Sequence, residues 1–448
     1  MNKHIQLPFK VDVITLGCKV NQFESESIDA ELHKRWVQDN NNGRKTIDIC
    51  IINTCTVTQK AAMQSRQAIR RAIRDNPDAI VLATGCYAQS EPLALQKIKG
   101  LDYIIGNTEK HLIAQIISES ASFQKQPLPI LLHNDIGNEK DLPKTVMPVI
   151  ENRTRPFIKI QDGCDNFCSY CIVPYTRGPS RSVLPEDVLS MIRSLPAPKR
   201  QEIVLTGIHL GKYGLDFSPP CSLLSLLKQI EDEKIVGRIR LSSIEPVELT
   251  DNLLKYAVGS DTICHHFHIP LQSGDNHILK RMNRPYDAQL FENLIKKIHQ
   301  SIPDAGIGVD IMVGFPGETD AAFENTYALL AALPVTYFHV FPFSSRPGTK
   351  ASTYPDHVSP DIIKKRRNKL LALSRTKKLE FYSKMVGKIL YVLIENKRES
   401  ATQKLTGVSS NYVRVVIDGD DCLKNKIIPC RITKVINQNA VYGNPCPD

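Results

Sequence analysis

Three short apolar runs near the N-terminus each lead into a cysteine. They are 11–16 before Cys18, 47–52 before Cys55, and 80–83 before Cys86. Helical patterns over 25–37 and 58–74 separate the runs, which predicts strands alternating with helices around a parallel sheet. Because parallel strands present their C-terminal ends at one edge, we expect the three cysteines to meet there and hold a metal cluster. The alternative for any single cysteine is a buried small hydrophobic side chain, as expected for Cys50.

A second group of cysteines lies within one short loop. Cys164, Cys168 and Cys171 follow the extended run 156–161 at CxxxCxxC spacing. Three thiolates can hold three irons of a [4Fe-4S] cluster and leave the fourth iron open to a small molecule. Structural zinc normally takes four ligands from two separated pairs, and a disulfide would leave one thiol over. The spacing therefore favours an iron–sulfur cluster over zinc or a disulfide.

Length and composition limit the number of domains, the cellular compartment and the kind of partner that we expect. A chain of 448 residues predicts two to three domains. The N-terminus lacks an apolar signal core, and the longest apolar stretch, 327–335, is too short to span a bilayer, so we expect a cytoplasmic protein without membrane association. In a reducing compartment, twelve cysteines indicate metal binding or catalysis before disulfides. The net charge of +10 suggests a polyanionic partner, although charge also reports an ordinary solvated surface.

The central part of the chain repeats a strand–helix pattern. Strand-like runs occupy 156–161, 202–205, 238–242, 266–269, 307–313 and 336–341. Helical patterns between them cover 185–194, 222–231, 288–300 and 320–332. Six such units predict a parallel barrel or partial barrel with its active site at the C-terminal ends of the strands. We interpret residues 119–149, which show little periodicity, as a linker that precedes it.

The C-terminal part changes character. A strongly basic helical pattern covers 361–380 and is followed by short strand-like runs. These runs are 388–395, 404–409, 412–417 and 427–432. They predict a small β-barrel over 381–446.

Several motifs together resemble the radical S-adenosylmethionine methylthiotransferases. The carriers are LGCKVNQ at 16–22, NTC at 53–55, GCYAQ at 85–89, the CxxxCxxC loop with PYTRG at 174–178, PLQSG at 270–274 and GFPGET at 314–319. The resemblance implies an α/β chain with a doubly wound parallel methylthiotransferase domain at 9–118, a partial (β/α)6 radical barrel at 150–380 and an RNA-binding TRAM domain at 381–446. It also implies two [4Fe-4S] clusters: an auxiliary one held by Cys18, Cys55 and Cys86, and a radical one held by Cys164, Cys168 and Cys171.

The same resemblance implies a reaction. Family members modify adenosine 37 of tRNA or an aspartate of a ribosomal protein. Residues 17–26 and 53–58 are similar to the subgroup that converts N6-threonylcarbamoyladenosine to its 2-methylthio form, whereas the isopentenyladenosine subgroup more often has Cys-Met-Asn near Cys18. S-adenosylmethionine would supply the methyl group and the radical, and a donor such as flavodoxin or ferredoxin the electron. The alternatives are isopentenyladenosine, the ribosomal aspartate, and a non-catalytic cluster-bearing RNA-binding protein.

Polar residues near the expected barrel strand ends are candidates for binding S-adenosylmethionine. They are Tyr170 in the cysteine loop, Thr206 and Gly207, Ser243 and Glu245, Gln272, and Asp310. A carboxylate such as Asp310 is seldom buried in a strand without a partner, which favours a pairing or pocket role. The alternatives are loop packing for Tyr170 and a simple turn for Gly207. We expect His265, His266 and His268 to be pocket polar groups and not metal ligands, because cysteines already supply the iron sites.

Basic residues are candidates for contact with tRNA. Arg66, Arg70 and Arg74 recur at i, i+4 spacing on one expected helix, and Lys364 and Arg367 lie on the basic helix near the C-terminus. One face of each helix could bind phosphate groups. The alternative is an ordinary solvated helix face.

Overall fold

The structure is a computed structural model that describes residues 9–35, 46–119, 123–143, 147 and 153–446. The chain divides into two compact units. Unit 1 comprises residues 1–150, 161–183 and 344–352, and unit 2 comprises 151–160, 184–343 and 353–448. Both cysteine groups lie in unit 1, because the loop with Cys164 belongs to it. None of the helices formed by the described residues is long and apolar enough to cross a membrane.

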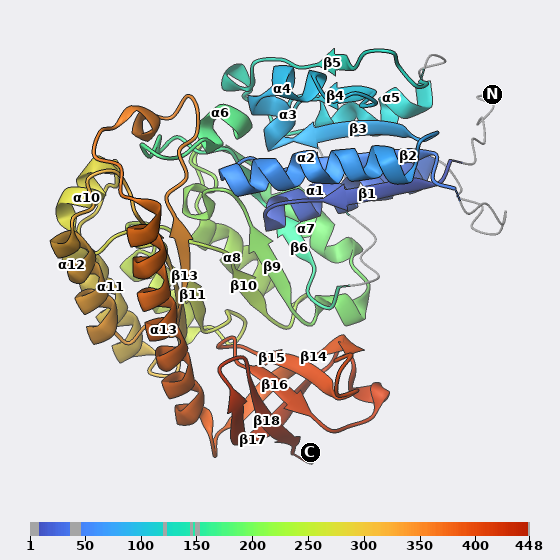
Figure 1. Ribbon diagram of the computed structural model, residues 1–448. Coiled ribbons are helices and arrows are strands. Elements are labelled where there is room, and N and C mark those ends of the chain that lie inside the picture. Colours follow the sequence, from blue (N-terminus) through green and yellow to red (C-terminus); the bar gives the residue numbers. More distant parts are fainter. Residues whose placement is uncertain (1–8, 36–45, 120–122, 144–146, 148–152, 447–448) are drawn as a thin grey trace. The chain divides into compact units, whose positions relative to one another are not determined.

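A five-stranded parallel sheet forms the centre of unit 1 (Figure 1). Its strands follow one another in chain order: β1 (Val11–Thr15), β2 (Ile49–Thr54), β3 (Ile80–Gly85), β4 (Tyr103–Ile105) and β5 (Ile130–Leu132). Every residue of β2 and β3 is buried, as expected for central strands that are covered on both faces. Strand β5 was not predicted; it lies within the residues interpreted as a linker and pairs with β4.

Helices pack on both faces of this sheet. Alternate residues of β2 point to opposite faces. Cys50 and Ile52 therefore pack with helix α2 (Gln59–Asp75), whereas Ile49 and Ile51 pack with α1 (Lys19–Arg35) and α5 (Ile113–Glu119). Helix α2 begins where the Thr58 side chain accepts a hydrogen bond from the backbone of Ala61. The other elements of unit 1 are α1 (Lys19–Arg35), α3 (Cys86–Ser90), α4 (Pro92–Gln96), η1 (Lys110–Leu112), α5 (Ile113–Glu119), η2 (Ile136–Asn138), β7 (Gln161–Asp162), α6 (Val173–Arg177) and β8 (Arg181–Ser182).

Unit 2 contains the predicted partial barrel. Its six parallel strands are β6 (Phe157–Lys159), β9 (Ile203–Thr206), β10 (Ile239–Leu241), β11 (His266–His268), β12 (Gly306–Val313) and β13 (Tyr337–Pro342). They form two three-stranded sheets, which isolated parallel bridges such as Ser243 to His268 join into one curved layer. The expected (β/α)6 architecture is confirmed.

Amphipathic helices cover the outside of this barrel. In α11, Phe291, Ile295 and Ile298 recur at helical spacing and are buried. Burying each such side chain contributes about 1.5–3 kcal/mol. The helical elements are α7 (Pro185–Ser194), η3 (Ala197–Arg200), η4 (Leu210–Lys212), α8 (Leu223–Asp232), α9 (Asp251–Gly259), α10 (Asn276–Arg281), α11 (Ala288–Ser301), α12 (Asp320–Ala332) and α13 (Pro360–Met385). Another turn, η5 (Lys350–Thr353), contains the point in the chain where the last segment of unit 1 ends.

A closed β-barrel completes unit 2, as predicted. Its strands are β14 (Ile389–Arg398), β15 (Leu405–Ser409), β16 (Arg414–Ile417), β17 (Ile427–Asn437) and β18 (Ala440–Pro445), with the turn η6 (Asp421–Leu423) between β16 and β17. The order around the barrel is β14-β15-β16-β18-β17. Strand β18 was not predicted, because its Gly443, Asn444 and Pro445 are typical of a turn.

A buried charge network holds this C-terminal barrel against the larger barrel. Glu202 pairs with Arg240 through Nε and with Arg238 through Nη2, both at 2.8 Å. The same guanidinium groups donate to the backbone oxygens of Ser409 at 3.0 Å and Tyr391 at 2.9 Å. Burial raises the pKa of Glu202, but Arg240 and Arg238 outweigh burial and lower the pKa below its ordinary value. The ionised carboxylate therefore fixes two arginines that reach across to strands β15 and β14.

Candidate functional site

The first cysteine group lies at the C-terminal edge of the sheet in unit 1. Cys18 follows β1, Cys55 follows β2, and Cys86 begins α3 directly after β3. Cys55 and Cys86 are buried, and Cys18 is exposed. Burial and the nearby Cys86 and Cys18 thiols together raise the pKa of Cys55 to about 11. The strand ends thus bring Cys18 and Cys86 close enough to Cys55 to interact with it electrostatically.

Glycines before two of these cysteines allow the close approach. Gly17 has φ +102°, and a Cβ atom there would lie 2.9 Å from the Cβ and 3.0 Å from the Sγ of Cys55. Gly85 has φ +95°, and a Cβ atom there would lie 2.4 Å from the side-chain oxygen of Asn53. Both positions require a residue without a side chain, so the Gly-Cys pairs are part of the geometry of the site.

The second cysteine group lies on a loop held by backbone hydrogen bonds. The backbone N–H of Cys164 donates to Gly178 at 3.0 Å, and that of Cys171 donates to Cys168 at 2.9 Å. The N–H of Val173 points at the Cys171 sulfur at 3.5 Å. Such a donor stabilises a thiolate. Cys168 is buried, while Cys164 and Cys171 are half-buried.

A buried arginine connects the segments that carry the two cysteine groups. Arg177, in α6 after the second group, donates through Nη1 to Glu24 at 3.0 Å and to Asp162 at 2.9 Å. Its Nη2 atom donates to the side-chain oxygen of Asn21 and to Glu24. Glu24 also pairs with the buried Lys110 at 2.7 Å. Because Asn21 and Glu24 lie on α1 directly after Cys18, the network ties the second loop to the first cysteine group.

The positive charge of Arg177 lies close to the first cysteine group. Burial lowers the pKa of Arg177, but Asp162 and Glu24 outweigh burial and raise it well above its ordinary value, and Cys86 and Cys18 add to this effect. The guanidinium is therefore charged, and it lies close enough to Cys86 and Cys18 to interact with them electrostatically. In the sequence, Arg177 stands out only as part of the motif at 174–178, so its place in the site was not predicted.

Two more polar contacts around the cysteines were also missed. The side-chain amide of Asn107 donates to the backbone oxygen of Thr176 at 2.6 Å and lies 4.0 Å from the Cys86 sulfur. Arg346 is buried and donates to the side chain of Thr56, the residue after Cys55. Each contact joins residues far apart in the chain, so no local pattern signals it.

The arrangement of the cysteines fits clusters better than single ions. The only three donor atoms within 4.8 Å of one another among the described residues belong to two histidines and an aspartate, not to cysteines. Sulfur ligands of one tetrahedral zinc would lie roughly 4 Å apart, given Zn–S bonds of about 2.3 Å. No disulfide joins any cysteine in the part of the chain that the structure describes. Three separated thiols beside a buried cation suit an anionic polynuclear cluster.

The candidates for binding S-adenosylmethionine lie mainly in unit 2, toward the C-terminal ends of its strands. Thr206 ends β9 with Gly207 directly after it, and Ser243 follows β10. Gln272, after β11, has φ +66° and donates its backbone N–H to the Asp310 backbone oxygen at 2.8 Å. The structure thus brings Thr206, Gly207, Ser243 and Gln272 to neighbouring strand ends of one unit, whereas Asp310 lies within β12. Tyr170, which is half-buried, lies in unit 1.

Glu245 has a structural partner. It pairs with Arg284, which also donates to the Tyr286 hydroxyl at 3.0 Å. Burial raises the pKa of Glu245, although Arg284 and His209 oppose the rise. A ligand that contacts Glu245 would therefore share this carboxylate with Arg284.

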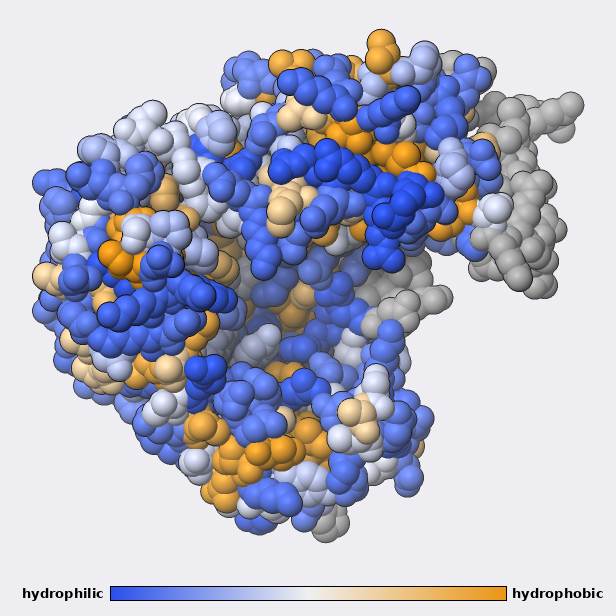
Figure 2. Space-filling view, in the orientation of Figure 1, coloured by the Kyte–Doolittle hydropathy of each residue, from blue (hydrophilic) through white to orange (hydrophobic). Residues whose placement is uncertain are grey.

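The three arginines of α2 differ in their surroundings. Arg66 donates to the Tyr87 hydroxyl at 2.7 Å, and Arg74 pairs with Asp75 at 2.9 Å. Arg70 is exposed and has no acidic group within 4.0 Å among the described residues. Figure 2 shows hydrophilic side chains along the face of α2 that is turned to the viewer. Of the predicted basic stripe, Arg70 is the member most available to an anion.

The basic residues of helix α13 also differ in their surroundings. Lys364 and Arg367 are exposed, and neither has an acidic partner within the described residues. Arg366, between them, is buried and pairs with Glu318. The basic character of α13 therefore combines a structural arginine with exposed charges.

Comparisons with known proteins define the class. Residues 158–330 match the radical SAM superfamily, and residues 10–106 match a family described as uncharacterized protein family UPF0004. The fold is similar to that of TsrM, a radical S-adenosylmethionine methyltransferase from Kitasatospora setae, with a TM-score of 0.57 and 14% identity, covering 77% of each chain. The parallel barrel and the CxxxCxxC loop are thus those of a radical S-adenosylmethionine protein.

Two curated relatives narrow the class. The threonylcarbamoyladenosine tRNA methylthiotransferase MtaB of Bacillus subtilis is 37% identical, covering 94% of this chain and 93% of the relative. The tRNA-2-methylthio-N(6)-dimethylallyladenosine synthase of Pelotomaculum thermopropionicum is 33% identical over 95% of both chains. The chain belongs to the radical S-adenosylmethionine methylthiotransferase family, which confirms the resemblance found in its motifs.

Proposed function

We propose that this enzyme adds a methylthio group to C2 of N6-threonylcarbamoyladenosine at position 37 of tRNA. The observation that carries the proposal is the presence of two cysteine triads in one compact unit, with Arg177 connecting their segments. The substrate rests on the name of the Bacillus relative, which is 37% identical, against 33% for the dimethylallyladenosine relative. The network around Arg177 supports chemistry that uses both triads together.

The donor sets assign two [4Fe-4S] clusters. Cys18, Cys55 and Cys86 would hold the auxiliary cluster, and the CxxxCxxC cysteines would hold the radical cluster. When bound, the clusters supply one electron to S-adenosylmethionine and a site for the sulfur that is transferred. The electron comes from a donor such as flavodoxin or ferredoxin, and the reaction takes place in the cytoplasm.

The residues of the chain position and charge the two sites. Arg177 keeps a buried positive charge beside Cys18 and Cys86, which lowers the cost of holding thiolates in a protein interior. Glu24 and Asp162 fix the guanidinium from opposite segments. A fixed charge needs no reorganisation when the charge of a neighbouring group changes.

We assign the remaining contacts from the positions of the residues in the fold. We assign contacts with S-adenosylmethionine to Tyr170, Thr206, Gly207, Ser243, Glu245 and Gln272. Contacts with tRNA are assigned to Arg66, Arg70, Arg74, Lys364 and Arg367, and to a TRAM domain at 381–446. Arg70, Lys364 and Arg367 are the strongest of these, because exposed cations without acidic partners bind phosphate at the least cost.

Nucleoside analysis of tRNA tests the proposal. Cells that lack the protein would be complemented with the wild type, Cys164→Ala, Cys18→Ala or, as a matched control, Cys422→Ala, and their tRNA nucleosides measured by liquid chromatography with mass spectrometry. Cys422 is exposed on the C-terminal barrel and belongs to neither triad. We expect the wild type and Cys422→Ala to restore the 2-methylthio form of threonylcarbamoyladenosine, and both triad variants to fail.

Other outcomes contradict separate parts of the proposal. Restoration by Cys18→Ala would exclude a role for the first triad. If cells that lack the protein lose methylthio-isopentenyladenosine and not the threonylcarbamoyl nucleoside, the substrate would be isopentenyladenosine and the reaction would still be methylthiolation. If neither nucleoside changes, mass analysis of ribosomal proteins would test the aspartate substrate.

A further inference from the structure

Three neighbouring strands of the barrel in unit 2 bring two histidines and an aspartate together. His268 lies on β11, Asp310 on β12 and His339 on β13, and Asp310 and His339 are direct partners in the strand register. The Oδ1 atom of Asp310 lies 2.9 Å from Nε2 of His268 and 3.3 Å from Nδ1 of His339. Among the described residues, no other group of histidine, cysteine or carboxylate side chains places three donor atoms within 4.8 Å of one another.

These short distances are ion-pair contacts between the two imidazoles and the carboxylate. Oδ1 of Asp310 is fully buried and meets neither ring nitrogen with good hydrogen-bond geometry. Ligands of one tetrahedral metal ion, at bond lengths of about 2.0–2.2 Å, lie roughly 3.3 Å from one another. The two measured separations match that spacing. The three side chains therefore converge in the way that ligands converge on an ion.

The donor atoms of the cluster also suit a cation. The cluster offers two imidazole nitrogens and one carboxylate oxygen. This donor set is typical of zinc and ferrous iron.

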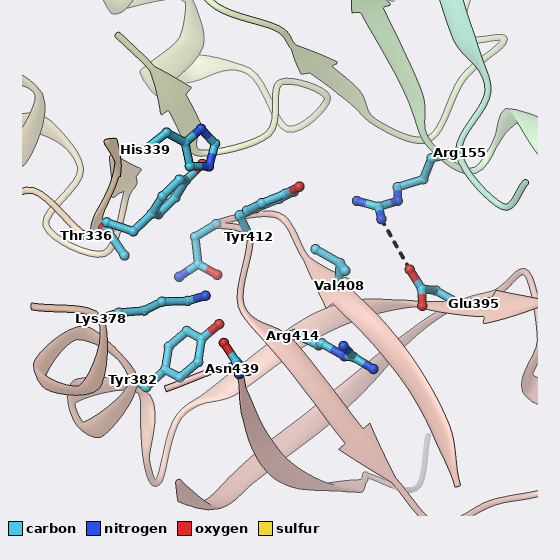
Figure 3. A pocket seen from close by; sticks show the side chains of 12 residues that line it. Arg155, Thr336, His339, Lys378, Tyr382, Glu395, Val408, Tyr412, Arg414 and Asn439 are labelled. Carbon is cyan, nitrogen blue, oxygen red and sulfur yellow. Dashed lines mark hydrogen bonds and ion pairs between the residues drawn. The ribbon is translucent and has the colours of Figure 1, made fainter. Parts of the chain in front are cut away.

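A pocket in unit 2 gives access to the cluster. His339 lines a pocket of about 470 Å³ together with Tyr337, Tyr412 and Lys378 (Figure 3). The His339 side chain is 54% exposed, whereas that of His268 is 12% exposed. Of the three side chains, only that of His339 lines the pocket, so the pocket reaches the cluster from the His339 side. Water or a ligand oxygen from the pocket can complete the coordination of an ion at the cluster.

Aromatic neighbours fix the imidazole rings. The ring of Tyr337 lies 5.4 Å from that of His339 and 6.3 Å from that of His268, measured between centroids. The Tyr337 hydroxyl is itself 2.9 Å from Nε2 of His266. Such packing orders the ligands before the ion binds. We propose that His268, Asp310 and His339 form a binding site for a divalent transition-metal ion, with zinc or ferrous iron as the best match.

This site is separate from the cysteine triads and does not depend on the proposed tRNA substrate. The proposal differs from two expectations drawn from the sequence, that Asp310 contacts S-adenosylmethionine and that His268 is a polar pocket group. Histidine ligands were not expected because cysteines already supply the iron sites. The new site has no cysteine and lies in unit 2.

Zinc binding to the cluster-loaded, full-length protein tests the proposal. The protein would be dialysed to equilibrium against Zn²⁺, and zinc and iron per chain counted together by mass spectrometry, because zinc is then distinguished from cluster iron. We expect His339→Ala, His268→Ala and Asp310→Asn each to bind one zinc fewer than the wild type, with iron unchanged. The matched control is His277→Ala, an exposed histidine on α10 outside the cluster, which should keep the wild-type zinc.

Further measurements distinguish loss of the metal site from misfolding of a variant. His339→Ala truncates an exposed side chain, so its fold and iron content should be intact even if His268→Ala misfolds. Zinc should raise the thermal midpoint of the wild type but not of His339→Ala, because an ion that binds only the folded chain stabilises it. X-ray absorption at the zinc edge should show nitrogen and oxygen ligands alone. Equal zinc in His339→Ala and the wild type, or sulfur ligands, would overturn the proposal.

Discussion

Arg177 and Glu24 form a buried ion pair at 3.0 Å although 153 residues separate them in the chain. Glu24 lies on the helix after the first cysteine, and Arg177 lies just after the last cysteine of the second triad. The pair therefore sets the position of one cysteine-bearing segment against the other, and several predictions about stability and metal content depend on such buried contacts.

Replacing Arg177 should be severely destabilising. Arg177→Gln would leave Glu24 and Asp162 without their shared cation, and removing one partner of a buried pair costs about 3–5 kcal/mol. Urea denaturation measures this loss. The control is Arg193→Gln, whose partly exposed ion pair with Glu233 should contribute less than about 1 kcal/mol. Equal losses in both variants would show that the Arg177 network does not hold the segments together.

Gly17→Ala should disturb the first cysteine group. Alanine at φ +102° is strained, at a cost of about 1–3 kcal/mol, and its Cβ atom would meet Cys55 at 2.9 Å. We expect the iron content to fall toward that of Cys55→Ala. In the control Gly259→Ala the new Cβ atom has no neighbour within 4 Å, so iron should be unchanged. A full iron content in Gly17→Ala would contradict the role of this glycine.

Glu202 should make stability depend on pH in acid. Because its folded-state pKa is lowered by Arg240 and Arg238, its contribution is present above the ordinary glutamate pKa of about 4.3 and is lost as the pH falls below that value. At neutral pH, Glu202→Gln should cost about 3–5 kcal/mol. In iron-free protein, urea unfolding should show the difference between wild type and variant shrinking below this pH. A difference that stays constant in acid would contradict the assignment.

Arg70→Gln should weaken tRNA binding by an electrostatic mechanism. If Arg70 contacts a phosphate, the slope of log affinity against log salt should decrease in magnitude by about 1. Filter binding over a range of salt concentrations measures this slope. Arg193→Gln, which removes an exposed arginine that is paired with Glu233 in unit 2, should leave the slope unchanged. The same slope in wild type and Arg70→Gln would place the tRNA elsewhere.

Most strands and the longer helices could be predicted because their signals are local. Each strand that precedes Cys18, Cys55 or Cys86 lies in a mainly apolar run, and the cysteine follows within a few residues. Strand β5 is only three residues long and stands among prolines and charges, so its pairing with β4 supplies the stability that its own sequence does not signal.

The contacts around the sites could not be predicted in the same way. Arg177 acquires its role only when Glu24 is brought to it, and the cluster of His268, Asp310 and His339 exists only when three strands take their register. Alternation along a strand indicates which residues share a face, but not which strand lies beside it. Which side chains lie next to one another is therefore decided only when the strands pair in the folded sheet.

The discontinuity of unit 1 has a consequence for how the enzyme is made. Its third segment, residues 344–352, returns to the cysteine-bearing unit after 160 residues of unit 2, and Arg346 from that segment binds the side chain of Thr56 beside Cys55. During synthesis from the N-terminus, the first triad leaves the ribosome long before this segment exists. A nascent chain would therefore expose open, oxygen-sensitive thiols, and loading of iron into a finished site must wait until about four-fifths of the chain has been translated.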